Sequence, residues 1–208
     1  MNLLYLYMKI LLLKINNNID YNHFINIYFF NENEIFIINK IKNCNNKKIK
    51  IISILLQKYI IKKNLNVNLN NIYIKKNKFG KPYVNNFEYN ISHDKDLIGI
   101  IYNKDNKVGL DIMSLDRKID ITIFKSIFTN KEYNKIKEKK DFLTYWCLKE
   151  SYLKAIGLGL NIDLSRLEFL IQYNNIKLYI DNILQNNCYF EYFIYENKYI
   201  ICICIINK

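Results

Sequence analysis

Three charged residues in the second half of the chain have the types and spacing that phosphate chemistry requires. Asp111 lies in the apolar run 108–113, where a buried carboxylate is costly unless it is paired or bound to a metal ion. Glu150 and Lys154 are four residues apart, so a helix would present them on one face. A carboxylate and an ammonium group aimed at one phosphate can serve as base or metal ligand and as electrostatic clamp. The alternatives are an exposed edge carboxylate for Asp111 and a surface ion pair for the other two, worth about 0.3–0.5 kcal/mol.

Two other groups of residues offer chemistry that is less specific. Segment 90–94 reads Asn-Ile-Ser-His-Asp and contains His93, one of two histidines, and a single histidine is more often structural or exposed than functional. The five cysteines include no C-x-x-C pair, which argues against a disulfide framework or a zinc site and favours a reducing compartment. Cys202 and Cys204 would share one face of a strand, where we interpret them as small buried hydrophobic residues.

The hydrophobic pattern predicts the helices that would carry these side chains. Apolar spacings of three and four predict an amphipathic helix over residues 48–63. A longer helix is predicted over 142–156, with Asp141 as its cap and Gly157 and Gly159 at its end. Two short helices are expected at 120–128 and 130–137, separated by Thr129, with Asn130 as a possible N-cap.

The same pattern predicts strands in both halves of the chain. Apolar runs predict strands at 97–102, 108–113, 167–173, 176–180, 188–195 and 199–206. In the second of these, Val108, Leu110 and Ile112 should face one way, and Gly109, Asp111 and Met113 the other. Residues 103–107 should form a hairpin loop, which is also the best candidate boundary between two halves. We interpret the apolar segment 3–13 as a further strand, although it could also be a poor signal-peptide core.

Composition excludes several classes of protein. With 31 Lys and Arg against 19 Asp and Glu, the net charge is +12, and half of the residues are hydrophobic, enough for a sizeable core. No apolar run reaches the roughly 18–20 residues of a membrane span. The charge attracts acidic partners, but heavy use of Asn, Ile, Lys and Tyr indicates a biased genome, so solvated lysines are an equally good explanation.

Four segments, taken in order, carry a resemblance to a known family. They are Gly80-Lys81-Pro82, Asn90-Ile91-Ser92-His93, Val108-Gly109-Leu110-Asp111, and the run from Trp146 to Lys154, which reads Trp-Cys-Leu-Lys-Glu-Ser-Tyr-Leu-Lys. This series resembles the 4′-phosphopantetheinyl transferases of the Sfp-like, monomeric class. Segments 128–133, 155–160 and 165–169 extend the likeness toward the broad-specificity animal members, of the aminoadipate-semialdehyde dehydrogenase type.

The resemblance implies a fold, a reaction and partners. The fold would be α+β, with two similar halves, 1–105 and 106–208, that form a pseudo-dimer around the active-site cleft. The enzyme, a holo-acyl-carrier-protein synthase, would move the 4′-phosphopantetheine group of coenzyme A to a serine of an apo carrier protein, releasing adenosine 3′,5′-bisphosphate. Coenzyme A is the substrate and Mg²⁺ the cofactor. The implied protein is a cytoplasmic monomer that binds no nucleic acid and has no membrane span. Organellar targeting stays open.

The resemblance also assigns roles to individual residues. Asp111 and Glu150 match the magnesium ligands, and Glu150 is also the proposed base toward the attacking serine. Lys154 matches the lysine that holds the pyrophosphate and could protonate its leaving oxygen. His93, with Ser92 beside it, matches the histidine near the 3′-phosphate of coenzyme A, and Lys81 matches a lysine on the nucleotide.

This sequence departs from the family pattern at two positions. Met113 stands where bacterial members have a third acidic ligand, so water is expected in its place, with Asp94 as a possible supplement. Asn45 stands where the family usually has an arginine. Lys47 and Lys48 beside it are expected to serve the 3′-phosphate as point charges, without the bidentate fork of arginine.

The carrier is expected to bind a lysine-rich surface in the second half. The lysines of segment 120–140 are Lys125, Lys131, Lys135, Lys137, Lys139 and Lys140, and its acids are Asp120, Glu132 and Glu138. A solvated helical face is the alternative. For the whole chain, the competing hypotheses are a basic nucleic-acid-binding domain and a catalytically inactive, carrier-binding relative of the family.

Overall fold

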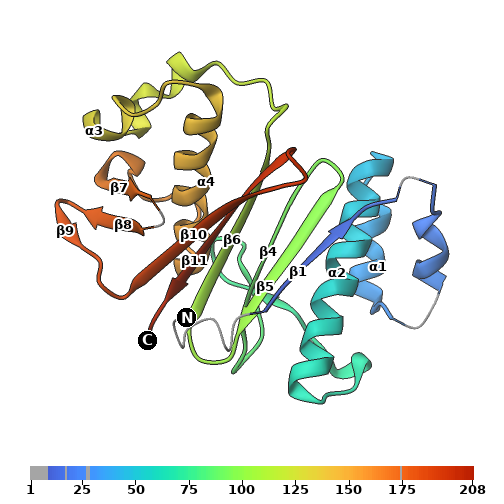
Figure 1. The fold of residues 1–208 in the computed structure, drawn as a ribbon. Coiled ribbons are helices and arrows are strands. Elements are labelled where there is room, and N and C mark those ends of the chain that lie inside the picture. Colours follow the sequence, from blue (N-terminus) through green and yellow to red (C-terminus); the bar gives the residue numbers. More distant parts are fainter. Residues whose placement is uncertain (1–8, 17, 27–28, 174) are drawn as a thin grey trace.

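The computed structural model describes residues 9–16, 18–26, 29–173 and 175–208 (Figure 1). The α-helices are α1 Glu32–Asn39, α2 Cys44–Leu65, α3 Asn130–Tyr133 and α4 Lys139–Ile156. The strands are β1 Lys9–Lys14, β2 Lys75–Lys76, β3 Pro82–Tyr83, β4 Glu88–Asp94, β5 Leu97–Asn103, β6 Lys107–Ser114, β7 Leu167–Gln172, β8 Asn175–Ile180, β9 Ile183–Leu184, β10 Cys188–Tyr195 and β11 Tyr199–Ile206. Short 3-10 helices lie at Tyr21–Asn26, Leu69–Asn71, Ile121–Ile127 and Leu164–Arg166. The expected α+β class is confirmed.

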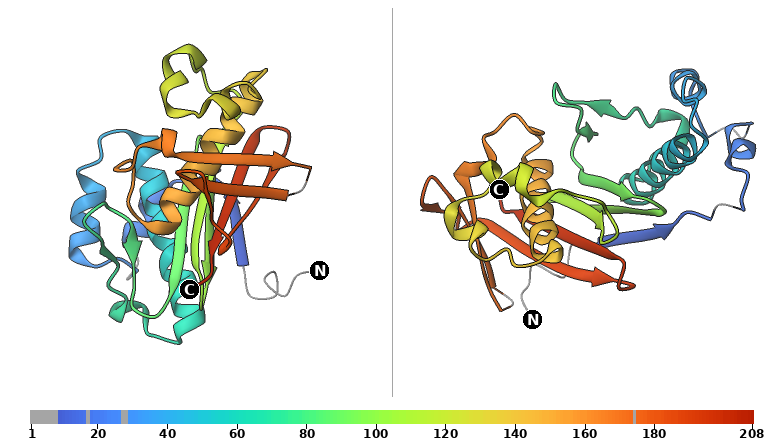
Figure 2. Two further views of the ribbon diagram at one scale, coloured as in Figure 1. Left: turned by 90° about the vertical axis from the view of Figure 1, so that its left-hand side faces the viewer. Right: turned by 90° about the horizontal axis from the view of Figure 1, so that it is seen from above.

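Two three-stranded antiparallel sheets form the centre of the molecule. The first has the order β1-β5-β4 and packs against α2, and the second has the order β10-β11-β6 and packs against α4. Figures 1 and 2 show the two sheets next to each other, with α1 and α2 at one end of the molecule and α4 at the other. A smaller sheet, β7-β8-β9, lies beside α4. The division into halves at residue 105 stays a prediction.

The predicted hairpin between the strands on either side of residues 103–107 is wrong. Strand β5 is the central strand of its sheet, with β1 on one edge and β4 on the other, so neither edge is free for β6. The Asn103 side chain accepts hydrogen bonds from the backbone N–H groups of Asp105 and Asn106, and the turn that it stabilises leads the chain into the second sheet. Strand β6 pairs there with β11.

The two sheets meet at β4 and β6, and side chains join them. Because β6 pairs with β11 on one edge, every second N–H group of β6 points to its open edge. Three side chains of β4 accept from these groups, in the pairs Asn90–Leu110, Ser92–Ile112 and Asp94–Ser114, at 2.9, 3.2 and 2.8 Å. We call this row of three hydrogen bonds the β4–β6 junction. Strand β4, which the hydrophobic pattern did not predict, therefore connects the two sheets.

Helix ends differ from the predictions where side chains cap them. Helix α2 begins four residues earlier than predicted, at Cys44, because the side chain of Asn43 accepts from the N–H of Asn46. Helix α4 begins at Lys139, and Asp141 is its third residue, whose carboxylate accepts from the N–H groups of Lys137 and Glu138.

Two further predictions of local structure need correction or completion. Thr129, not Asn130, caps α3. Within the predicted strand 3–13, residues 9–13 lie in β1, and residues 3–8 lie outside the described residues. None of the helices in the described part of the chain has the length and apolar character of a membrane span.

Strand β6 has the two faces that the sequence predicts. Val108, Leu110 and Ile112 lie in the core that the two sheets share. The opposite face packs on α4, and Gly109 lies so close to the helix that a Cβ atom there would be 1.9 Å from the backbone oxygen of Ser151. Cys202 and Cys204 are buried on this same side, as expected for small hydrophobic residues.

A buried ion pair attaches α3 to α4. The Nζ atom of Lys149 lies 2.8 Å from Oε2 of Glu132 and also donates to the carbonyl groups of Leu164 and Leu167. Burial raises the pKa of Glu132 and lowers that of Lys149, and each charge opposes the shift of the other. Glu132 is therefore absent from the surface of segment 120–140, which becomes more positive than its sequence indicates.

Candidate active site

Asp111 is the centre of a buried polar cluster on the α4 side of β6. Its Oδ1 atom accepts from Nζ of Lys154 at 2.5 Å and from Oγ of Ser92 at 3.2 Å. The side chain is 6% exposed, and its Oδ2 atom is buried without a hydrogen-bond partner among the described residues. The alternative of an exposed edge carboxylate is therefore wrong.

Lys154 reaches this cluster from the last turn of α4. Its Nζ atom lies 2.9 Å from Oγ of Ser92, and its side chain is 28% exposed. An ammonium group has three N–H donors, and Asp111 and Ser92 take two of them. The described residues offer no acceptor to the third, which is therefore available to a ligand that enters from solvent.

Glu150 lies one helical turn before Lys154, so both project from the same face of α4. Burial and, after it, the negative charge of Asp111 raise the pKa of Glu150, and the charge of Lys154 opposes this shift. The two carboxylates are thus close enough to repel each other. A cation between them would remove that repulsion.

These two residues fit a magnesium ion. No cluster of three or more His, Cys, Asp or Glu side chains suited to a metal is found in the described ranges. Magnesium, however, prefers one or two carboxylates, with waters and phosphate oxygens as its other ligands. The unpartnered Oδ2 of Asp111 is a buried oxygen without a donor, and it fits the role of such a ligand.

Two further positions bear on the metal site: that of Met113, in place of a third acidic ligand, and that of Asp94, as its possible supplement. Met113 is 4% exposed and packs in the core around α4. The Oδ2 atom of Asp94 accepts from the N–H of Ser114 at 2.8 Å, within the β4–β6 junction, and lies 3.4 Å from the guanidinium group of Arg117. Asp94 is therefore not a member of the hydrogen-bonded cluster around Asp111.

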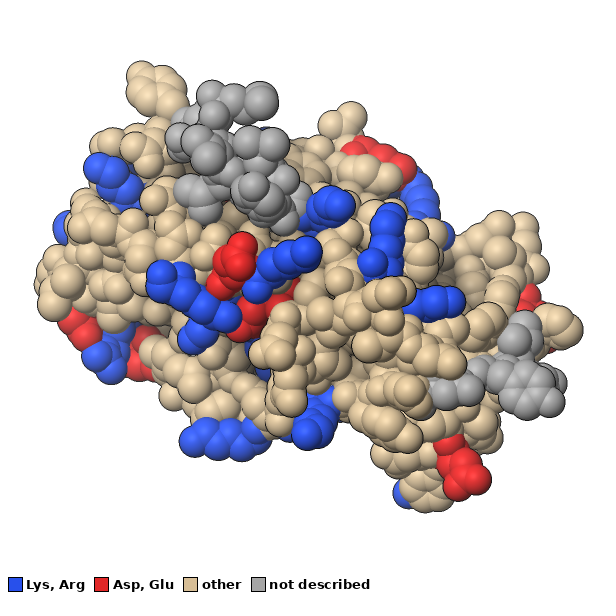
Figure 3. All heavy atoms as spheres, turned by 90° about the horizontal axis from the view of Figure 1, so that it is seen from below, with Lys and Arg blue, Asp and Glu red and all other residues tan. Residues whose placement is uncertain are grey.

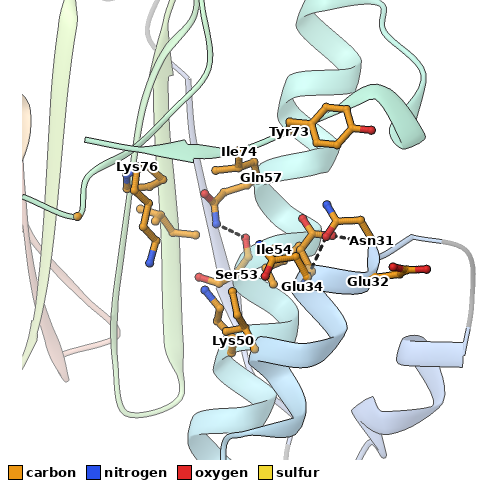
Figure 4. A pocket seen from close by; sticks show the side chains of 15 residues that line it. Asn31, Glu32, Glu34, Lys50, Ser53, Ile54, Gln57, Tyr73, Ile74 and Lys76 are labelled. Carbon is orange, nitrogen blue, oxygen red and sulfur yellow. Dashed lines mark hydrogen bonds between the residues drawn. The ribbon is translucent and has the colours of Figure 1, made fainter. Parts of the chain in front are cut away.

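A cavity of about 600 Å³ lies between α1, α2 and residues 73–82 (Figure 4). The residues on α2 that line it are spaced by three and four: Lys50, Ser53, Ile54 and Gln57. Figure 4 shows Lys50 and Lys76 pointing into the same space. Burial and, after it, the charge of Lys76 lower the pKa of Lys50, and the charge of Glu34, which also lines the cavity, opposes this shift. The cavity therefore holds two cations close together, with a carboxylate near Lys50.

Lys47 and Lys48, the predicted replacements for the family's arginine, do not line this cavity. Lys48 borders a smaller hollow together with Asn45 and Lys95. Lys50 is the residue that sequence reasoning missed, one turn further along α2. The polar stripe of Lys50, Ser53 and Gln57 within the Ile- and Leu-rich middle of this helix is the signal that could have revealed it.

The turn that contains Gly80-Lys81-Pro82 lies between this cavity and α4. Gly80 and Pro82 line the cavity, whereas the Lys81 side chain points away from it and donates to the backbone oxygen of Ala155 at 2.9 Å. Burial lowers the pKa of Lys81 to about 8. Asn77 donates to the oxygen of Gly157 at 2.7 Å, so this turn holds the end of the helix that carries Lys154.

His93 and Ser92 lie on opposite faces of β4. His93 is the exposed residue of the strand, and partial burial of its ring together with the charge of Lys154 lowers its pKa. Ser92 points to Asp111, and Ile91 lines the cavity. The structure thus joins Ser92, Asp111, Glu150 and Lys154 in one cluster and leaves Lys81, Lys47 and Lys48 outside it.

Proteins of known function resemble this chain in sequence. An L-aminoadipate-semialdehyde dehydrogenase-phosphopantetheinyl transferase of Xenopus laevis is 28% identical over 181 residues, 73% of this chain and 60% of the relative. Its human counterpart is 34% identical over 145 residues, 60% of this chain and 47% of the relative. The 4′-phosphopantetheinyl transferase gsp of Aneurinibacillus migulanus is 35% identical over 119 residues, 54% of this chain and 49% of the relative. The chain thus spans about half to three fifths of the length of these relatives.

Two family profiles match consecutive parts of the chain. The profile described as 4′-phosphopantetheinyl transferase, N-terminal, matches residues 20–104, and that of the 4′-phosphopantetheinyl transferase superfamily matches residues 107–204. Each of the four motif segments lies within one of these matches. The chain belongs to the 4′-phosphopantetheinyl transferase superfamily.

Proposed function

We propose that this protein transfers the 4′-phosphopantetheine group of coenzyme A to a serine of an apo acyl carrier protein, as a holo-acyl-carrier-protein synthase. The observation that carries the proposal is the cluster of Asp111, Ser92 and Lys154, in which one carboxylate oxygen and one ammonium donor have no partner among the described residues. A nucleic-acid-binding domain has no need of such a cluster. On the face seen from below, the Lys and Arg side chains lie in separate groups, with acidic side chains beside some of them (Figure 3).

In the proposed reaction, the serine oxygen of the carrier forms a bond to the β-phosphorus of coenzyme A. The bond from that phosphorus to the bridging oxygen breaks, and adenosine 3′,5′-bisphosphate leaves with the electron pair. Glu150, whose pKa is raised, accepts the serine proton directly or through a water. Lys154 donates its third N–H to the leaving oxygen. A magnesium ion held by Asp111 and Glu150 would neutralise the charge of the diphosphate.

A labelling experiment tests this function. The protein is incubated with fluorescent coenzyme A, magnesium and a panel of apo carriers, each beside a variant whose modified serine is alanine. We expect label on at least one carrier and none on its alanine variant. Absence of label on every carrier, together with salt-sensitive binding of nucleic acid, would favour a nucleic-acid-binding domain. Binding of a carrier without labelling it would favour a catalytically inactive relative of the family.

We propose that the nucleotide part of coenzyme A occupies the cavity beside α2, with its 3′-phosphate near Lys50 and Lys76. Replacing both with methionine should raise the KM for coenzyme A about tenfold or more, because charge-assisted hydrogen bonds are worth about 1.5–3 kcal/mol each. The KM for 3′-dephospho-coenzyme A should change much less. The matched control replaces Lys47 and Lys48 with methionine. A larger rise of the KM for coenzyme A in this control than in the variant of Lys50 and Lys76 would favour Lys47 and Lys48 as the partners of the 3′-phosphate.

We propose that an acidic carrier docks on the lysine-rich surface of segment 120–140. Lys135 and Lys137 are exposed there, while Glu132 is withdrawn into the interior. Reversing both charges to glutamate should raise the carrier KM about tenfold and leave the KM for coenzyme A within twofold. The same reversal at Lys62 and Lys63, exposed at the end of α2, is the control. Equal effects on both substrates would contradict this docking site.

We further propose that residues 1–105 and 106–208 are the two halves of a transferase that acts as a cytoplasmic monomer. One copy of the chain supplies Ser92 from the first half and Asp111 and Lys154 from the second, which supports action as a monomer. The cysteines are all free, which supports a reducing compartment. Light scattering of the active protein should give the mass of one chain, and full activity confined to a dimer fraction would contradict this proposal.

A further inference from the structure

The hydroxyl group of Ser92 uses its whole hydrogen-bonding capacity within the protein. It accepts from Nζ of Lys154 at 2.9 Å and from the backbone N–H of Ile112 at 3.2 Å. A serine hydroxyl has two acceptor sites and one proton, so its proton is left for Oδ1 of Asp111, 3.2 Å away. Ser92 is 4% exposed, and no donor or acceptor remains on it for a nucleotide.

We infer that Ser92 is a positioning residue for Asp111 and Lys154, rather than a contact of coenzyme A. The inference rests on the proposed function. Ser92 comes from β4 in the first half, whereas its two partners come from β6 and α4 in the second. By donating to Oδ1 of Asp111, it fixes the rotation of the carboxylate and leaves Oδ2 as the free oxygen. By accepting from Lys154, it orients the third N–H of that ammonium group outward.

The geometry of β4 supports this reading over a role at the nucleotide. Successive residues of a strand point to opposite faces. Ile91 lines the cavity beside α2, and Ser92 therefore points away from it, to the cluster. Residues that hydrogen-bond to metal ligands, without touching the metal ion themselves, commonly contribute 10–100-fold to metal affinity or activity.

Asn90 provides a matched control on the same strand face. Its side chain accepts from the N–H of Leu110 at 2.9 Å, just as Ser92 accepts from Ile112. Asn90 is also buried, at 4% exposed, but it makes no hydrogen bond to Asp111 or Lys154 in the described residues. Asn90→Ala therefore removes a bond of the β4–β6 junction and spares the cluster.

The experiment compares Ser92→Ala, Ser92→Thr and Asn90→Ala with the unmodified protein. The readouts are kcat, the KM for coenzyme A, the unfolding temperature and the dissociation constant of Mn²⁺ measured by electron paramagnetic resonance. For Ser92→Ala we expect kcat to fall 10–100-fold, Mn²⁺ to bind about tenfold more weakly, and the KM for coenzyme A to stay within twofold. Asn90→Ala should lower the unfolding temperature by about as much as Ser92→Ala does, and its kcat and Mn²⁺ affinity should stay within twofold of those of the unmodified protein. Ser92→Thr, which keeps the hydroxyl, should recover most of the lost Mn²⁺ affinity.

Two results would overturn the inference. A raised KM for coenzyme A at unchanged kcat in Ser92→Ala would make Ser92 a nucleotide contact. Equal losses of kcat and Mn²⁺ affinity in Ser92→Ala and Asn90→Ala would make it structural only. If the unmodified protein labels no carrier, the proposed function fails, and the Mn²⁺ measurement on the same variants still decides the role of Ser92.

Discussion

Asp111→Asn should reduce the rate of phosphopantetheine transfer by about a thousandfold or more. The substitution keeps the shape of the side chain but removes the anionic oxygen that is free in the structure and the counter-charge of Lys154. Both losses act where the diphosphate must be neutralised, and each is worth several kcal/mol of barrier. The rate is measured as incorporation of fluorescent phosphopantetheine into an apo carrier at saturating magnesium.

Asp94→Asn is the control for this substitution. It makes the same chemical change at the end of β4, where an amide oxygen can still accept from the N–H of Ser114. We expect its transfer rate to stay within a few-fold of that of the unmodified protein. An Asp111→Asn variant with near-normal activity would show that the chemistry does not occur at this cluster at all.

Gly109→Ala should have the second largest effect, on both stability and activity. A Cβ atom at this position would lie 1.9 Å from the backbone oxygen of Ser151 and 2.6 Å from the backbone nitrogen of Ala155. These are backbone atoms of α4, which cannot rotate away, so the helix must move off the sheet. Overpacking of this kind costs about 1–3 kcal/mol or more. Because Ser151 and Ala155 directly follow Glu150 and Lys154, we also expect kcat to fall about a hundredfold in the folded protein.

Gly99→Ala tests whether the loss of activity in Gly109→Ala comes from the contact of residue 109 with α4. In β5 the added Cβ atom would meet the methyl groups of Leu12 and Ile112, at 2.8 and 2.9 Å, and such side-chain ends can shift. Its unfolding temperature should fall less, and its kcat should be unchanged. Similar kcat losses in the two glycine variants would mean that general loosening of the core, and not displacement of α4, lowers the rate.

The sequence predicted the elements in which pattern and packing agree. Strands β10 and β11 have the predicted bounds because each consists almost wholly of apolar and aromatic residues that favour strands. Helix α4 ends as predicted because Gly157 adopts the left-handed conformation that terminates a helix, with φ of +73°. Helical spacing alone predicted that Glu150 and Lys154 would lie on one face of this helix.

The missed features depend on contacts between distant segments. Alternating polar residues in β4 are typical of a face in water, but here they are buried because the open edge of β6 needs acceptors. Lys149 was part of a recognised motif, yet its partner Glu132 lies 17 positions away on another helix. Lys81 was identified from the Gly-Lys-Pro motif, but only the fold shows that its side chain points to the backbone oxygen of Ala155.

The β4–β6 junction draws unequally on its two strands, which belong to the two proposed halves of the chain. The second half contributes only backbone N–H groups, which every residue except proline can supply at positions 110, 112 and 114. The first half contributes specific side chains, and a valine at position 90 or 94 would suit the strand but leave a buried amide without an acceptor, at a cost of about 1–3 kcal/mol. A hybrid protein that exchanges halves with a relative should therefore tolerate a foreign second half more readily than a foreign first half. All three side chains that determine whether this junction can form come from β4.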